Sequence, residues 1–153
     1  VPRHPQRFDA VADLVASRGW RWKRRTAGLP GPDTEVWIGD SMGEMVAYYS
    51  LADCCFIGGS LLPLGGQNLI EAAACGCPVL IGPHTFNFKQ AAEDAIAAGA
   101  ACRIASVAEL GAEVASLVAD APRRAAMVAA AHRFSAAHSG AARRTLDFIA
   151  RWL

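Results

Sequence analysis

The sequence predicts an α/β fold with a parallel sheet that helices cover on both faces. Short apolar runs alternate with helical segments along the 153 residues, and this alternation is typical of βαβ units. The runs at residues 54–57 and 78–81 are apolar without interruption, as expected of strands buried on both faces. Hydrophobic residues make up 53% and charged residues 19% of the chain, which excludes an intrinsically disordered protein.

Apolar spacing and helix-breaking residues place the expected elements in order. Strands are expected over residues 20–24, 35–38, 54–57, 78–81 and 101–104. Helices are expected over residues 8–18, 42–49, 68–74, 87–98, 107–118, 122–138 and 141–153. The first helix is read from the apolar positions 8, 11, 12 and 15, and Gly19 ends it.

Two of these helices carry more detailed expectations. The helix over residues 42–49 is expected to bury one face, formed by Met42, Met45, Val46 and Tyr49. For the helix over residues 87–98, Asn87 is the expected N-cap and Gln90 its reciprocal hydrogen-bonding partner.

Charge and composition exclude several classes of protein. The net charge of +1 argues against a general nucleic-acid binder, and no run reaches the ~18 apolar residues that a membrane-spanning helix needs. Five cysteines occur without a Cys-x-x-Cys pair, so neither a cysteine metal site nor a disulfide framework is indicated. Because Val1 stands in place of an initiator Met, we expect the chain to be part of a longer protein.

Basic and acidic residues are unevenly distributed. Residues 1–30 hold seven basic and two acidic groups, residues 31–100 hold one and eight, and residues 101–153 hold seven and four. Basic flanks around an acidic middle indicate either a face that meets anions or helices with solvated arginines. The basic, aromatic stretch 20–25 has two similar interpretations, a contact with anionic lipid or a solvated edge strand.

Glycine-rich loops at strand ends are the strongest candidates for a binding site, because ligands of open α/β sheets bind outside the carboxyl ends of the strands. The segment Gly58-Gly59-Ser60 is followed by Gly65-Gly66-Gln67-Asn68 and then Glu71. Glycines let the backbone approach a ligand, and free N–H groups at a helix start attract phosphate. Glu71 either accepts hydroxyl hydrogen bonds from a ribose or forms a structural capping box with Asn68.

Other strand-end loops offer weaker candidates. The loop 39–45 either reads a nucleobase edge with its main chain or simply caps a helix. His84 and Arg3 follow strand ends, where each could bind a phosphate or carboxylate; a plain loop histidine and a surface ion pair are the alternatives. Neither a Rossmann Gly-x-Gly-x-x-Gly nor a P-loop is present, and no Asp-x-Asp pair supports a metal-bridged diphosphate.

Taken together, these loops resemble the 3-deoxy-D-manno-octulosonic acid (Kdo) transferases over essentially the whole chain. The motifs occur in the family's order: Pro2-Arg3-His4-Pro5-Gln6-Arg7-Phe8, Gly39-Asp40-Ser41-Met42-Gly43-Glu44-Met45, Gly58-Gly59-Ser60, Gly65-Gly66-Gln67-Asn68 with Glu71, Gly82-Pro83-His84-Thr85-Phe86-Asn87-Phe88, and Gly140-Ala141-x-x-Arg144.

The resemblance implies the C-terminal half of a GT-B glycosyltransferase, with residues 1–153 forming a single Rossmann-like domain that binds a nucleotide sugar. The family transfers Kdo from CMP-Kdo to the lipid A precursor at the cytoplasmic face of the bacterial inner membrane, without a metal or another cofactor. The general base is expected in the N-terminal half. This chain alone is therefore expected to be a soluble fragment that binds donor weakly and does not turn over.

The resemblance also implies roles for individual residues. The backbone of the loop with Gly39, Ser41, Met42, Gly43 and Glu44 borders the cytosine. The phosphate is approached by Gly59, Ser60, Gly65, Gly66 and Asn68, and the ribose hydroxyls are held by Glu71. Arg3 and His84 are candidates for the phosphate or for the Kdo carboxylate.

The chain departs from the family pattern at three positions. Ser41 stands where a Thr is usual, Gln67 where a His is usual, and Ala72 where a Pro is usual. Two other functions stay open: the donor domain of a different GT-B enzyme, such as a UDP-sugar transferase or epimerase, and a non-catalytic α/β nucleotide-binding module.

Overall fold

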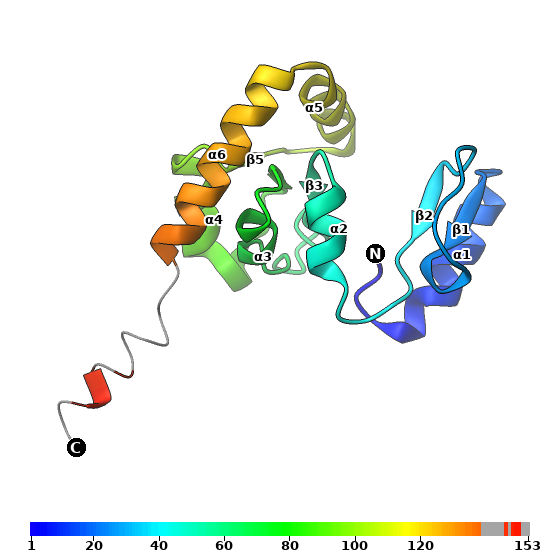
Figure 1. The fold of residues 1–153 in the computed structure, drawn as a ribbon, viewed down its shortest axis with the longest axis horizontal. Coiled ribbons are helices and arrows are strands. Elements are labelled where there is room, and N and C mark those ends of the chain that lie inside the picture. Colours follow the sequence, from blue (N-terminus) through cyan, green and yellow to red (C-terminus); the bar gives the residue numbers. More distant parts are fainter. Residues whose placement is uncertain (139–145, 147, 151–153) are drawn as a thin grey trace. The chain divides into compact units, whose positions relative to one another are not determined.

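The computed structural model describes residues 1–138, 146 and 148–150. The chain divides into two compact units, Val1–Glu44 and Met45–Leu153, and Figure 1 shows the elements of each. The predicted helix over residues 141–153, and the motif Gly140–Arg144 with it, lies outside the described residues apart from positions 146 and 148–150. No described helix combines the length and the apolar composition required to cross a bilayer.

The first unit is a small α/β arrangement. Its elements are η1 (Pro5–Arg7), α1 (Phe8–Ser17), β1 (Trp22–Arg24), η2 (Arg25–Ala27) and β2 (Val36–Ile38). The two strands pair in parallel, with Trp22 beside Val36 and Arg24 beside Ile38. The predicted end of the first helix is confirmed, since Gly19 follows α1 with a φ of +73° that favours glycine.

The second unit holds a three-stranded parallel sheet in the order β3-β4-β5. Its elements are α2 (Met45–Leu51), β3 (Cys55–Phe56), α3 (Ile70–Ala74), β4 (Val79–Ile81), η3 (Phe86–Phe88), α4 (Lys89–Ala97), β5 (Ala101–Arg103), α5 (Val107–Ala119) and α6 (Ala121–His138). In register, Cys55 lies beside Val79, and Ile81 beside Arg103.

The central strand β4 organises the core of the second unit. Its three residues, Val79, Leu80 and Ile81, are completely buried. Val79 and Ile81 belong to a cluster with buried residues of α3, α4 and α6, whereas Leu80 packs with Leu117 of α5 and Met127 of α6. Because successive strand residues point to opposite faces, helices cover both faces of this sheet. Burying each such side chain stabilises the fold by roughly 1.5–3 kcal/mol.

The predicted α/β class with parallel strands is therefore confirmed, and the strands are divided over two sheets, one in each unit. Within the described residues, strands pair with strands of the same unit: β1 with β2, and β4 with both β3 and β5. The expectation of one Rossmann-like domain over residues 1–153 stays a prediction.

The predicted buried face of the helix over residues 42–49 is wrong for two of its four residues. Helix α2 begins only at Met45, so Met42 lies in the preceding loop and is 63% exposed. Val46, in the first helical turn, is 62% exposed. Contact with the core is made further along, by Tyr49 and by Ala52 just beyond the helix.

The predicted capping of the helix over residues 87–98 is also wrong. A short 3-10 turn, η3, comes first, and α4 then starts at Lys89 with Phe88 as an N-cap that makes no side-chain bond. The Asn87 side chain instead donates hydrogen bonds to the carbonyls of Leu64 and Gly66, at 3.3 and 3.5 Å. A contact distant in sequence has therefore replaced the local cap.

The loops that follow β3 and β4 cross so closely that one glycine is required. A Cβ atom added at Gly82 would lie 2.2 Å from the Ser60 carbonyl oxygen and 2.6 Å from the Leu61 nitrogen. Both are backbone atoms, which no side-chain rotation can move away. Glycine at position 82 is what allows the two loops to lie against each other.

We predict that Gly82→Ala lowers the stability of the second unit by about 1–3 kcal/mol, because the methyl group forces the two loops apart. Urea unfolding followed by far-UV circular dichroism measures this loss. Gly58→Ala is the matched control, since a Cβ atom there meets nothing within 4 Å. Equal stability of the two variants would contradict the prediction.

Candidate functional site

Ser60 ties together the two loops of the second unit that the sequence singled out, residues 58–69 (the glycine-rich loop) and residues 82–88 (the β4–α4 loop). The fully buried hydroxyl of Ser60 donates to the carbonyl of Ile57 at 2.5 Å and accepts from the N–H of Gly82 at 2.8 Å. The Ser60 carbonyl accepts from the N–H of His84 at 2.9 Å. Its hydroxyl thus serves the fold, and the predicted contact with a phosphate stays a prediction.

Three glycines give the glycine-rich loop its shape. Gly59, Gly65 and Gly66 have φ values of +75°, +85° and +72°, which other residues rarely adopt. The N–H of Gly66 donates to the Gly59 carbonyl at 3.1 Å and closes the loop. The N–H groups of Gly65 and Asn68 donate to no acceptor within the described part of the chain. Gly65 is buried and Asn68 half-buried, and unpaired backbone N–H groups of this kind bind anions in other loops.

The alternative role of Asn68 and Glu71 as a capping box is not realised. The N-cap of α3 is Leu69, with no side-chain bond, and the Asn68 side chain accepts from the N–H of Ile70 at 2.9 Å. Glu71 is exposed, and its carboxylate makes no hydrogen bond or ion pair with any residue that the structure describes. The carboxylate therefore remains available to the hydroxyls of a ligand.

His84 lines a pocket that is formed by the β4–α4 loop and the start of α4. The pocket has a volume of about 180 Å³ and is lined by Pro83, His84, Thr85, Phe86, Lys89 and Glu93. His84 is half-buried, and its backbone is fixed by the bond to Ser60. The imidazole thus reaches a place where a bound group could sit.

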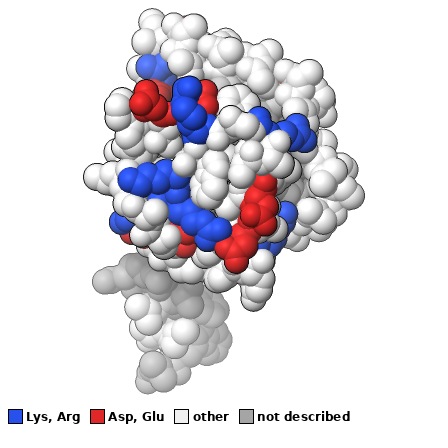
Figure 2. All heavy atoms as spheres, turned by 90° about the vertical axis from the view of Figure 1, so that its right-hand side faces the viewer, with Lys and Arg blue, Asp and Glu red and all other residues white. Residues whose placement is uncertain are grey.

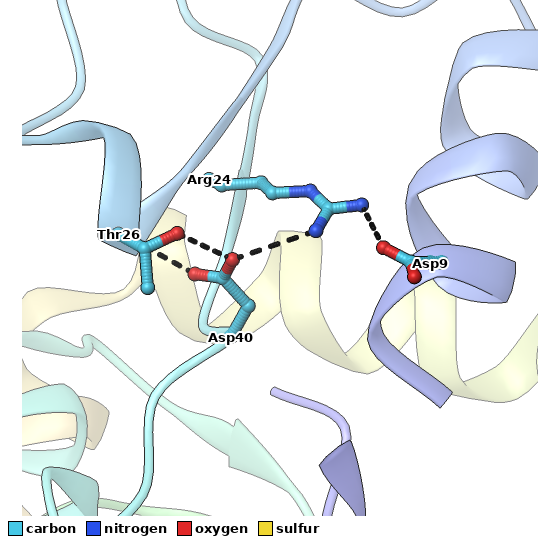
Figure 3. Close-up of polar contacts among 4 residues, drawn as sticks. All are labelled: Asp9, Arg24, Thr26 and Asp40. Atoms are coloured by element: carbon cyan, nitrogen blue, oxygen red, sulfur yellow. Dashed lines mark hydrogen bonds and ion pairs between the residues drawn. The ribbon is translucent and has the colours of Figure 1, made fainter. Parts of the chain in front are cut away.

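In the first unit, Asp40 anchors the loop that follows β2. Its buried carboxylate accepts hydrogen bonds from the N–H and the hydroxyl of Thr26, at 2.9 and 2.6 Å. Arg24 lies 3.8 Å from the same carboxylate and 2.6 Å from Asp9 of α1. Figure 3 shows the Arg24 guanidinium between the two carboxylates. This network fixes the backbone at Gly39 and Ser41, on either side of Asp40.

The environment of Asp40 favours its ionised form. Burial alone would raise the pKa of this carboxyl group, but the hydrogen bonds from Thr26 and the charge of Arg24 outweigh burial and lower the pKa below its usual value. Asp40 is therefore a permanent anion at neutral pH, held within the fold rather than offered to a ligand.

Side-chain bonds also occupy the rest of this loop. Glu44 accepts a hydrogen bond from Arg25 at 2.9 Å and another from the Ser41 hydroxyl. Met42 is exposed, and Gly43 has a φ of +78° with open space around it. With Ser41 and Glu44 engaged, a nucleobase would meet the main chain of the loop and the Met42 side chain.

The arginines of residues 21–25 are balanced by acidic residues of the same unit. Arg21 pairs with Glu35 at 3.1 Å, in addition to the pairs of Arg24 and Arg25 already described. Figure 2 shows bands of Lys and Arg side chains that lie directly beside bands of Asp and Glu side chains. The stretch is thus an ion-paired strand edge.

The structure groups the predicted residues by unit. Gly59, Ser60, Gly65, Gly66, Asn68, Glu71 and His84 belong to the two adjoining loops of the second unit and to α3. Gly39, Ser41, Met42, Gly43 and Glu44 form the loop after β2 in the first unit, and the exposed Arg3 precedes η1 there. Among the described residues, no group of three or more His, Cys, Asp or Glu side chains could hold a metal ion.

Sequence reasoning missed the residues that support the loop after β2. Arg24 and Arg25 were considered only as part of a solvated edge strand or of a contact with anionic lipid, and Thr26 was not considered. The parallel pairing of Arg24 with Ile38 brings the residues after one strand beside the residues after the other. Asp40 stands two positions beyond Ile38, and Arg24 and Thr26 stand at the end of the neighbouring strand. An acid at one strand end opposite a basic residue and a hydroxyl at the other was the signal that could have revealed this network.

Comparisons with known proteins agree with the motifs. Residues 23–134 match the family model of the group 1 glycosyl transferases. The chain is 53% identical to a 3-deoxy-D-manno-octulosonic acid transferase of Bordetella pertussis, over 100% of this chain and 36% of that protein. A protein of the same description from Haemophilus influenzae is 47% identical over 59% of this chain and 21% of its own length. The chain thus spans about a third of the length of the first relative.

A solved structure resembles most of the chain. It is the C-terminal CMP-Kdo binding domain of WaaA from Acinetobacter baumannii, with a TM-score of 0.83 and 33% identity, covering 88% of this chain and 70% of that one. The resemblance to the Kdo transferases and the fold of a GT-B C-terminal half are therefore confirmed.

We predict that Thr26→Val destabilises the first unit at pH 7 by about 1–2 kcal/mol, because it removes a donor to the buried carboxylate of Asp40. Since the folded-state pKa of Asp40 is lowered, its ionised form stabilises the fold above the unfolded-state value near 4. This stability is lost as the pH falls through the folded-state pKa. The deficit of the variant should therefore shrink under acid conditions.

Urea unfolding at several pH values, followed by tryptophan fluorescence, measures the effect, since Trp20, Trp22 and Trp37 all lie in the first unit. Ser17→Ala is the control, because the Ser17 hydroxyl donates to an uncharged carbonyl, that of Leu14. A deficit for Thr26→Val that stays constant with pH would refute the role of Asp40.

Proposed function

The chain belongs to the group 1 glycosyl transferases, and we propose that it is the donor-binding domain of a Kdo transferase, where it holds CMP-Kdo. The observation that carries the proposal is the likeness of most of this chain to the solved CMP-Kdo binding domain. The adjoining loops after β3 and β4 supply groups that suit such a donor.

Each part of the nucleotide has a candidate partner. The free N–H groups of Gly65 and Asn68 suit a phosphate, because oriented backbone N–H groups attract anions. The exposed carboxylate of Glu71 suits the two ribose hydroxyls, with which it forms charge-assisted hydrogen bonds. In the loop after β2, the main chain around Met42 and Gly43 is the proposed contact of the cytosine.

The proposed reaction is a substitution at the anomeric carbon of Kdo. An acceptor hydroxyl oxygen forms a bond to that carbon, the bond to the CMP phosphate breaks, and CMP leaves with the electron pair. A general base takes the proton of the hydroxyl. Because negative charge grows on the phosphate as the bond breaks, fixed N–H groups at that position stabilise the transition state more than the ground state.

The acceptor, the general base and the cellular location are proposed for a full-length Kdo transferase, because this chain resembles only one region of such a protein. The family resemblance supports the lipid A precursor as acceptor, a general base in an N-terminal half, and a location at the cytoplasmic face of the bacterial inner membrane. We propose that donor binding needs no metal ion or cofactor, because the backbone N–H groups of the glycine-rich loop interact directly with the charge of the phosphate.

We predict that the chain binds CMP more tightly than UMP and that Glu71→Ala weakens CMP binding by 1–3 kcal/mol, roughly 5- to 150-fold, through loss of the ribose hydrogen bonds. Isothermal titration calorimetry with CMP and UMP measures both effects. Preference for UMP would favour a UDP-sugar enzyme instead, and absence of binding to either would favour a non-catalytic module.

Two variants make the Glu71 test specific. Glu71→Gln keeps the shape but removes the charge, so we expect an intermediate affinity for CMP. Asp13→Ala removes an exposed acid from α1 and should leave the affinity within twofold. An unchanged affinity of Glu71→Ala would contradict the proposed contact of Glu71 with the ribose hydroxyls.

We also predict that an excess of EDTA changes the affinity for CMP by less than twofold, since no step of the proposed binding uses a cation. The same calorimetric titration, run with EDTA and then with added Mg²⁺, measures this. A loss of binding in EDTA that Mg²⁺ restores would contradict metal-independent binding.

A further inference from the structure

The pocket at the start of α4 is smaller than a site for a complete ligand. Its volume of about 180 Å³ lies below the roughly 300 Å³ at which sites for drug-sized ligands begin. It is therefore suited to one part of a larger ligand. Its lining combines an imidazole, an ammonium group and an aromatic ring, from His84, Lys89 and Phe86.

This pocket adjoins the glycine-rich loop directly. The N–H of Asn87 donates to the Gly65 carbonyl at 3.3 Å, and a Cβ atom added at Gly65 would lie 2.6 Å from the ring carbon Cε2 of Phe86. The Phe86 ring thus lies over Gly65, yet the residue remains 62% exposed. A ligand whose phosphate meets the N–H of Gly65 would place its next group in the pocket.

The pocket carries an unbalanced positive charge. Its single acid, Glu93, is paired with Arg103 at 2.6 Å, and Arg103 also donates to the Gly82 carbonyl at 3.1 Å. Lys89 is exposed, and no acidic side chain pairs with it among the residues that the structure describes. Because Arg103 neutralises Glu93, the ammonium group of Lys89 is left to attract an anion.

The position of Lys89 at the start of α4 is unfavourable with respect to the dipole of its own helix. It is the first residue of α4, which has no acid in its first turn, and a cation at a helix N-terminus is opposed by the helix dipole. The ammonium group of Lys89 therefore lies beside the pocket without an acidic partner and at a helix end that does not favour it, so it is a candidate for binding an anion.

We propose that Lys89 contacts the carboxylate of the sugar acid carried by the nucleotide donor and so selects an acidic sugar. The inference rests on the proposed function. The ulosonic acid bears a carboxylate that CMP lacks, and in the bound donor it follows the phosphate. Lys89 then binds the sugar, while the glycine-rich loop binds the phosphate.

The test compares CMP with CMP-Kdo on the 153-residue chain. Isothermal titration calorimetry is run on the wild type, Lys89→Gln and Lys89→Arg, with Lys23→Gln as the matched control. Lys23 is the other lysine of the chain, and it donates to the Leu29 carbonyl in the first unit. We expect Lys89→Gln to lose about tenfold in affinity for CMP-Kdo, as for one hydrogen bond to a charged group.

The two ligands separate the possible results. The inference is supported if Lys89→Gln binds CMP within twofold of the wild type. It also requires that Lys89→Arg and Lys23→Gln bind CMP-Kdo nearly as well as the wild type does. Equal losses for both ligands would assign Lys89 to the phosphate and overturn it, as would no loss for either. If the wild type bound neither ligand, the proposed function itself would fail. Thermal unfolding serves as the folding control, and Lys89→Gln should be no less stable than the wild type.

Discussion

The candidate site depends on one buried hydroxyl group. Ser60 bonds to the carbonyl of Ile57 and the N–H of Gly82, and its own carbonyl holds the N–H of His84. These bonds fix the loop after β3 against the loop after β4 before any ligand is present. A buried hydroxyl that lost one partner would cost about 1–3 kcal/mol, so the two loops keep one arrangement. This arrangement of the two loops sets the positions of the free N–H groups and of the pocket.

Much of the fold could be predicted from the sequence because its signals are local. Apolar runs such as 78–81 must be buried, and five of them separated by helical segments favour parallel pairing. Helix starts were less predictable. Asn87 fits a cap, but its side chain reaches carbonyls of the glycine-rich loop instead. Met42 fits an apolar face, but the helix begins three residues later. In both cases a contact outside the local segment decided the outcome.

For the site, the sequence identified the loops but not how each polar side chain is used. Ser60 looked like a ligand beside glycines, and the loop around Asp40 looked like a helix cap or a nucleobase contact. The structure uses the side chains of both residues for internal hydrogen bonds, as buried polar groups require. Glu71 looked like half of a capping box, and its carboxylate is free within the described residues. Lys89 was not considered as a candidate, because its lack of an acidic partner depends on Arg103, which neutralises the nearby Glu93. Such assignments need the three-dimensional partners of each group.

The close contact between α3 and α6 gives α6 an indirect influence on donor preference. Ala72 and Ala73 are completely buried, in one cluster with Ala130 and Ala131 of α6, and their small side chains let the two helices approach closely. Glu71 sits on α3, so its reach toward a ribose is set by this contact. A bulkier residue at position 130 would shift α3 without touching the loops. Laboratory selection for new sugar donors should therefore recover substitutions on the face of α6 that packs against α3, as well as at the binding edge.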